Sequence, residues 1–151
     1  DAQLARLEQL LESEGKAGRT RIVMLHHPPA IGAIGWRKAL ADAPALRAVL
    51  RRAGAELVLH GHARDARMDV VAGPSLPIPC LCVPSSSAVP NPKDQGALWH
   101  RLRLMDGAGG PRAMVEVRRW STEAEAFVPD GAYALSLPRV RSRDSGENVG
   151  R

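Results

Sequence analysis

Two short apolar runs on either side of a helical pattern constrain the fold of this chain more than any other feature. The runs are RIVMLH at 21–26 and ELVLH at 56–60. Uninterrupted apolar runs of this length are typical of parallel strands that are buried on both faces. Between them, Asp42 is a candidate N-cap and Gly54 a candidate stop for a helix with one apolar face, formed by Leu46, Val49, Leu50 and Ala53. Residues 21–60 therefore predict a strand–helix–strand unit, which in nearly all cases crosses over right-handedly.

The sequence predicts one helix before this unit and several strands after it. Residues 3–14 place their leucines on one helical stripe, and Gly15 is expected to end that helix. Four later runs have strand character and are separated by Gly, Pro, Ser or Asp clusters; they are 67–71, 78–83, 97–105 and 113–120. The pattern predicts an α/β fold, with a βαβ unit followed by mostly antiparallel strands.

The C-terminal part of the sequence is patterned less clearly. We predict a weakly structured return segment at 121–136, with at most one edge strand near 133–137, and a disordered tail at 137–151. The chain begins at Asp1 rather than at Met, so we also expect it to be part of a longer protein.

Composition argues against two classes of partner. The net charge of +5 comes almost entirely from arginine, but the arginines are scattered and aromatic residues make up only 3%, so nucleic acid is not an expected partner. No apolar run approaches the roughly 20 residues of a membrane helix, and no signal peptide is visible, so we expect no membrane partner and a cytoplasmic location.

Cys80 and Cys82 would point to the same face of a strand, which disfavours a disulfide between them. We expect both to be buried and reduced.

Four of the five histidines fall in two groups, each directly after a predicted strand. His26 and His27 stand in VMLHHPPA, and His60 and His62 stand in LVLHGHAR. The βαβ unit brings the carboxyl ends of its two strands to one edge of the sheet, where α/β proteins bind ligands. Neutral imidazole is the commonest protein ligand for transition metals. The spacing therefore predicts a metal site, with hydrogen-bonded structural histidines as the alternative.

LHHPP followed by HGHAR resembles the C-terminal half of the calcineurin-like metallophosphoesterases. That family's motifs are, in chain order, D-x-H, G-D, G-N-H-[DE], a lone H, and G-H-x-H; LHHPP matches the lone H, and HGHAR matches the last motif. The resemblance covers roughly residues 1–105. It implies a layered αββα-type sandwich, present here in part, with residues 1–120 forming the C-terminal part of a metallophosphoesterase domain.

The resemblance also implies roles for the histidines. His26 matches the lone-His metal ligand and His62 the His of G-H, and both would hold the same ion of a two-metal pair of Mn, Fe or Zn. His27 would lie beside the ligands or near the substrate. His60 precedes the motif, so we expect it to orient a neighbouring group or to be structural.

Arg64 departs from the family's pattern, because the final His of G-H-x-H would stand at this position. An arginine cannot ligate a cation, since it stays protonated and has no free lone pair. Binding of the second metal would therefore be weakened or lost, so the site would hold either two ions or only one. Two interpretations remain open: Arg64 is a fixed positive charge that partly replaces the ion and binds phosphate, or it is an inactivating substitution.

A larger departure is that D-x-H, G-D and G-N-H-[DE] are absent from the sequence. Those motifs supply the carboxylates and the catalytic residues, and two imidazoles alone are too few ligands for a stable site. We therefore expect the catalytic residues in a missing N-terminal half, and this fragment alone to be inactive.

The intact protein is expected to be a phosphomonoesterase or phosphodiesterase. It would hydrolyse a small-molecule or nucleotide phosphate ester by attack of a metal-bound hydroxide, and this chain would carry only part of the site. The alternative is a non-catalytic fragment or pseudoenzyme that retains the fold as a binding or scaffold domain.

Overall fold

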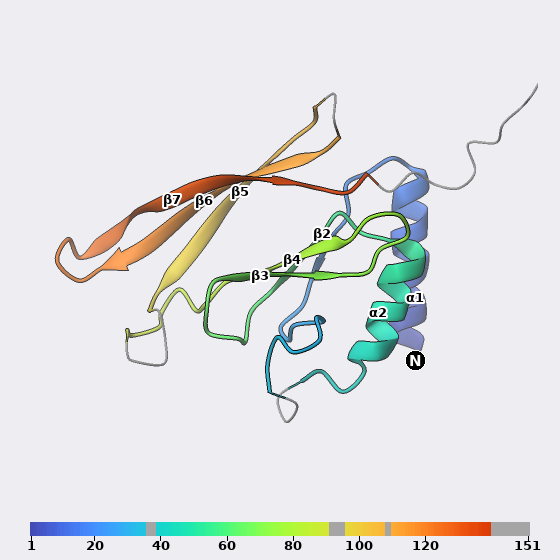
Figure 1. Ribbon diagram of the computed structural model, residues 1–151, viewed down its shortest axis with the longest axis horizontal. Coiled ribbons are helices and arrows are strands. Elements are labelled where there is room, and N and C mark those ends of the chain that lie inside the picture. The colour runs from blue at the N-terminus through green and yellow to red at the C-terminus, as the bar shows by residue number, and fades with distance from the viewer. Residues whose placement is uncertain (36–38, 91–95, 108–109, 140–151) are drawn as a thin grey trace, which may run out of the picture.

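The computed structural model describes residues 1–35, 39–90, 96–107 and 110–139. These residues form an α/β fold of two helices and seven strands (Figure 1). Their order along the chain is α1 (Ala2–Lys16), β1 (Ile22–Met24), α2 (Ala43–Ala53), β2 (Leu57–His60), β3 (Arg67–Val71), β4 (Ile78–Cys82), β5 (Leu98–Met105), β6 (Arg112–Ser121) and β7 (Ala126–Ser136).

The strands form two separate sheets. The first has the order β1-β2-β4-β3, in which β1, β2 and β4 are parallel and β3 runs antiparallel to β4. The second is an antiparallel meander of β5, β6 and β7. The parallel pairing of β1 with β2, joined through α2, confirms the predicted strand–helix–strand unit.

The chain stacks these elements in three layers. The side chains of β2 alternate: Val58 packs against α1 and α2, while Leu57 packs against the second sheet. Leu81 on β4 faces the second sheet in the same way, against Val115 and Leu135. The four-stranded sheet is therefore the middle layer, with both helices on one face and the three-stranded sheet on the other (Figure 1). The near-continuous apolar sequences of β2 and β4 follow from this position, because both faces of these two strands are buried.

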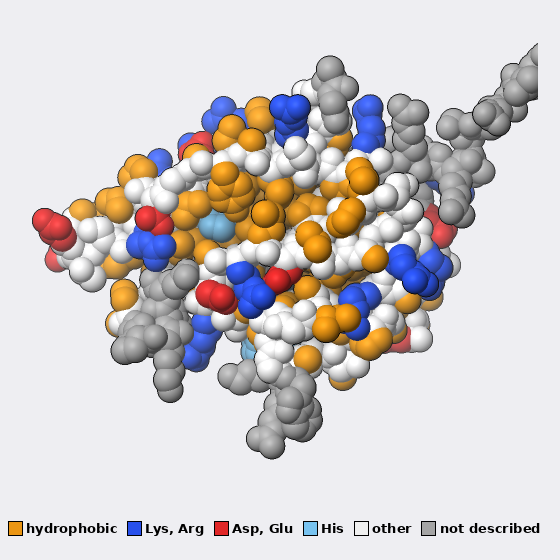
Figure 2. Space-filling view, in the orientation of Figure 1, with side chains coloured by type: hydrophobic (Ala, Val, Ile, Leu, Met, Phe, Trp, Pro, Cys, Tyr) orange, Lys and Arg blue, Asp and Glu red, His pale blue; other side chains and the backbone are white. Residues whose placement is uncertain are grey.

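The second sheet covers only part of the first. Met68 and Val70 on β3 lie on the face that points toward the second sheet, yet both are exposed. Figure 2 shows hydrophobic side chains over much of the surface between the two sheets. Neither of the helices in the described ranges has the length and apolar character that crossing a membrane requires.

A buried ion pair ties the two helices to the first sheet. The Arg21 guanidinium binds the Glu56 carboxylate with Nη2–Oε1 and Nε–Oε2 distances of 2.9 and 3.1 Å. Its Nη1 donates to the carbonyls of Leu11 on α1 and Ala53 on α2, both at 2.9 Å. Arg21 and Glu56 immediately precede β1 and β2, so this contact fixes where both strands begin.

The sequence predicts that α1 ends at Gly15, but Gly15 lies inside the helix. The same arginine explains why a glycine stands at this position. The helix continues to Lys16. A Cβ at Gly15 would lie 2.5 Å from Nη1 of Arg21, so the position needs a residue without a side chain. Glycine is there for close packing, and the prediction of a helix end was wrong.

The prediction of weak structure at 121–136 was also wrong, although the edge strand expected near 133–137 lies largely within an observed strand. Residues 126–136 form the long strand β7, which pairs with β6 from Ser121 to Arg112. Pro129 and Gly131 obscure this strand in the sequence, but β7 is an edge strand, where a missing N–H is tolerated, and the pairing shifts register between Val117 and Arg118.

The predicted disordered tail is wrong at its start. Leu137 and Pro138 are buried, and the Leu137 N–H donates to the Pro111 carbonyl at 3.0 Å. The remainder of that prediction, residues 140–151, lies outside the described residues.

Candidate metal centre

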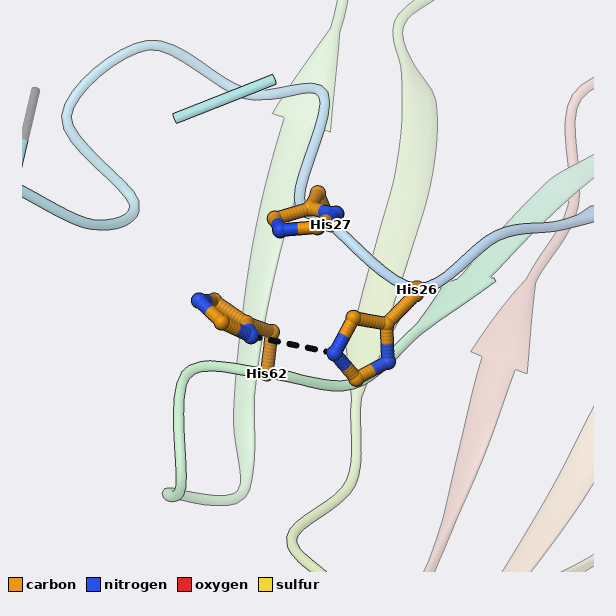
Figure 3. Close-up of side chains that lie close together, drawn as sticks. All are labelled: His26, His27 and His62. Carbon is orange, nitrogen blue, oxygen red and sulfur yellow. Dashed lines mark hydrogen bonds between the residues drawn. The ribbon is translucent and has the colours of Figure 1, made fainter. Parts of the chain in front are cut away.

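Three histidine rings meet at the carboxyl edge of the first sheet (Figure 3). His26 and His27 follow β1, and His62 follows β2. One potential ligand nitrogen from each ring lies within 4.8 Å of the other two. The two groups of histidines that the sequence separates thus come together, and they form a cluster that could hold a metal ion.

The contact between His26 and His62 is the shortest in this cluster. Nε2 of His26 lies 3.0 Å from Nδ1 of His62, and the ring centroids are 4.9 Å apart. The His27 ring lies over this pair, with its centroid 5.0 Å from that of His26 and 4.4 Å from that of His62. Without an ion, the short contact requires one ring to donate its proton to the other.

The spacing fits one cation. Two nitrogen ligands of a tetrahedral zinc ion, each about 2.0–2.1 Å from the metal, lie roughly 3.3 Å apart. The 3.0 Å between the nitrogens of His26 and His62 is close to that separation. His27, with a ring nitrogen within 4.8 Å of the other two, could supply a third donor. Within the described ranges, no second group of three potential ligands is present.

Main-chain hydrogen bonds extend the parallel pairing of β1 and β2 into the two histidine loops. The Leu25 N–H donates to the Leu59 carbonyl at 3.0 Å, and the Gly61 N–H donates to the His26 carbonyl at 3.1 Å. The backbone of the first loop is thereby held directly against that of the second. This continuation places the His26 backbone beside Gly61, the residue directly before His62.

The second loop has an unusual backbone. His62 and Arg64 both have φ of 67°, in the left-handed region. For a residue with a Cβ this conformation is unfavourable by about 1–2 kcal/mol. Such a conformation persists only where surrounding contacts determine it, and it is more frequent at functional sites.

His60 lies outside the cluster. It is 5% exposed and lies on the helix-facing side of β2, opposite Cys82 of β4. Its Nδ1 is 3.2 Å from the Gly61 carbonyl, and its Nε2 is enclosed without a hydrogen-bond partner in the described part of the chain. Burial lowers the pKa of this imidazole below its usual value, so the ring favours the neutral state.

Arg64 follows His62 by two residues in the second loop. Its side chain is exposed and makes no hydrogen bond or ion pair to any other residue that the structure describes. The nearby acidic residue Asp69 pairs with Arg67 at 2.9 Å, rather than joining the histidines. The cluster itself therefore consists of imidazoles only.

A groove of about 470 Å³ adjoins the cluster along β1. It is bounded by His26 and His27 at one end and otherwise mainly by apolar side chains, among them Leu4, Leu7, Leu10, Val23 and Leu46. β1 is an edge strand of the first sheet, and Met24 is 77% exposed. The site thus lies at the end of an uncovered strand.

No protein-family model matches this chain, and a comparison with curated proteins finds no match either.

Sequence reasoning singled out His26 and His62 but missed two features of this centre. It placed His27 beside the ligands, whereas the structure groups its ring with the other two. It treated Cys82 only as a core residue, whereas the thiol contacts the turn before His62. The His-His dipeptide is a signal for the first feature; nothing in the local sequence indicates the second.

Proposed function

We propose that this chain carries part of the metal centre of a phosphoric ester hydrolase. The observation that carries the proposal is the convergence of His26, His27 and His62, because the motifs that resemble metallophosphoesterases contain these histidines. In the proposal His26 and His62 hold one divalent ion, and His27 is a third donor or contacts the substrate. When bound, the ion would supply positive charge to polarise a phosphoryl oxygen and to acidify water.

The donor set favours particular ions. Neutral imidazole suits Zn, Cu, Fe and Ni, whereas Mg, Ca and Mn prefer oxygen ligands. Among Mn, Fe and Zn, we therefore propose zinc or iron for the ion held by these histidines. Because the three ligands carry no charge, the ion would keep its full positive charge and attract an anionic ester.

In this proposal further residues complete the site from beside β1. Three imidazoles leave a coordination position open, and the cluster contains no carboxylate to hold a second ion. The groove and the uncovered edge of β1 leave space there for additional strands. The finer fold is then the αββα sandwich, of which the helices, the four-stranded sheet and the three-stranded sheet would be three layers.

A binding or scaffold domain without activity is the second candidate. Arg64 favours it, because a guanidinium stands where the resemblance would place a ligand of the second ion. Both candidates predict that this chain binds one ion. They differ in whether the intact protein hydrolyses a phosphate ester.

The test compares His26→Ala and His62→Ala with the control His100→Ala, which removes a histidine from β5 in the other sheet. Co²⁺ binding to this chain is followed by absorption, and cleavage of bis(p-nitrophenyl) phosphate is measured with the intact protein. We expect the two site variants to lose at least about 100-fold in Co²⁺ affinity and to abolish cleavage, while the control retains both. Full cleavage by both site variants would refute the proposal, and Co²⁺ binding without any cleavage would favour the second candidate.

A further inference from the structure

One carbonyl group gathers several contacts at the turn that presents His62. The Gly61 carbonyl accepts hydrogen bonds from the Ala63 N–H at 2.8 Å and from the Cys82 thiol at 3.3 Å. Nδ1 of His60 lies 3.2 Å from the same oxygen. Of these contacts, only that of Cys82 comes from outside the loop and its own strand.

The direction of this carbonyl determines the direction of His62. The Gly61 oxygen and the His62 nitrogen belong to one planar peptide group, so fixing the oxygen also fixes the start of the His62 residue. His62 then leaves the peptide with φ of 67°, a conformation that a free loop would readily abandon. A group that holds the Gly61 carbonyl therefore holds the backbone from which the ring that faces His26 extends.

Cys82 is well suited to hold it. The residue is fully buried at the end of β4, whose pairing with β2 places it opposite His60. Burial raises the pKa of the thiol, so the group stays protonated and keeps its hydrogen for donation. Cys82 is not among the clustered ligands, which are all histidines.

Cys80 provides a natural comparison. It lies two residues earlier on the same strand, faces the same side and is equally buried. Its thiol, however, lies 3.7 Å from the carbonyl of Ile78 in its own strand, and not against the Gly61 carbonyl. The two cysteines thus differ mainly in whether they contact the Gly61 carbonyl.

We propose that Cys82 is a positioning residue for the metal centre, whose thiol orients the His62 ring through the Gly61 carbonyl. This inference rests on the proposed metal site and extends it to a residue that ligates nothing itself. Groups that orient metal ligands typically contribute 10–100-fold to metal affinity. Because a thiol is a weak donor, we expect an effect at the lower end of that range.

The experiment titrates this chain with Co²⁺ in three variants. Cys82→Ala is expected to weaken Co²⁺ binding about tenfold and to change the absorption spectrum of the bound ion. Cys82→Ser keeps a donor at the same place and should restore affinity to within about threefold. Cys80→Ala removes a sulfur of equal burial and should leave affinity and spectrum unchanged, although thermal unfolding of both alanine variants should shift by similar amounts.

Equal Co²⁺ affinity in Cys82→Ala and Cys80→Ala would overturn the inference, as would a failure of Cys82→Ser to restore binding. If the unsubstituted chain binds no Co²⁺, the proposed function fails and the inference is judged on the metal-free protein. The ring resonances of His62 in NMR spectra should then shift in Cys82→Ala and not in Cys80→Ala. Identical His62 resonances in the two variants would refute the positioning role.

Discussion

The side chain at position 64 is an arginine where the resemblance would place a further ligand. In the structure it is exposed, and its backbone has φ of 67°. Its charge is therefore available to an incoming anion, while its chemistry excludes metal ligation. Substitutions of Arg64 can therefore test its charge and its lack of a metal ligand separately.

Arg64→His is expected to raise the amount of metal bound per chain, because it adds an imidazole two residues after His62. Arg64→Gln removes the charge without adding a ligand and should leave the metal content unchanged. Elemental analysis of the purified variants measures this content. An unchanged value in Arg64→His would remove position 64 from the metal site.

Two histidines outside the cluster should make stability depend on pH. Burial lowers the pKa of both His60 and His100 below the ordinary 6.5. The folded chain therefore holds them neutral at a pH where the unfolded chain already binds protons. The free energy of unfolding should accordingly fall as the pH decreases through about 6.5, and this loss should be absent at higher pH.

Urea denaturation at pH 7.5 and pH 5.5 measures this effect. The free energy of unfolding of the double variant His60→Gln/His100→Gln should differ less between the two conditions than that of the unsubstituted chain. An equal difference in both proteins would assign the pH dependence to other groups.

Whether a site residue could be predicted from the sequence depends on what positions it in the fold. The strand periods and the βαβ connection place His26 and His62 at one edge, so their meeting could be inferred. The position of the His27 ring depends on the path of the loop that enters Pro28 and Pro29, which no period encodes. The role of Cys82 depends on strand register, because only the pairing of β4 with β2 places its thiol beside Gly61.

Among the elements, α1, α2, β1 and β2 are joined by a single buried ion pair. Arg21 and Glu56 are 6% and 4% exposed, and the arginine also donates to the Leu11 carbonyl within α1 and to the Ala53 carbonyl at the end of α2. Removing one partner would leave the other charge buried without compensation. Such a change is strongly destabilising, whereas exposed ion pairs contribute little.

Glu56→Gln is therefore expected to lower the free energy of unfolding by about 3–5 kcal/mol. Glu8→Gln is the matched control, because Glu8 pairs with Arg52 between the same two helices but at the surface. Its effect should be small. Urea denaturation followed by circular dichroism measures both, and similar losses in the two variants would show that burial of the Arg21 pair is unimportant.

The elements themselves were predictable to different degrees. The residue runs that became β2 to β6 carry clear apolar or alternating patterns, and their predicted bounds lie within about two residues of the observed ones. β7 carries no such pattern, since Pro129 and Gly131 interrupt it. Pairing with the neighbouring strand β6 is what orders this segment. Its sequence encodes the strand only together with that partner.

At the scale of the molecule, the described residues leave the edge of β1 and the apolar groove beside it uncovered next to the three rings. An ion bound there would link the loops after β1 and β2 and would add its binding free energy to that of folding, because the unfolded chain holds no assembled site. Stability should thus report on the site independently of any reaction.

Zn²⁺ at about 100 times its dissociation constant is expected to stabilise the chain by about 2.7 kcal/mol, and a chelator should reverse the effect. Differential scanning calorimetry measures the corresponding rise in melting temperature. His62→Ala should show no rise, and His100→Ala should behave like the unsubstituted chain. A rise of the same size in His62→Ala would place the Zn²⁺ elsewhere.

The hydrogen bond from the Gly61 N–H to the His26 carbonyl joins the two ligand loops through main-chain atoms alone. Exchanging a side chain at position 26 or 62 therefore leaves the distance between the two backbones in place. His26→Cys or His62→Cys would offer a sulfur ligand in place of an imidazole on the same backbone frame, so the preference of this pocket can be redesigned toward softer ions.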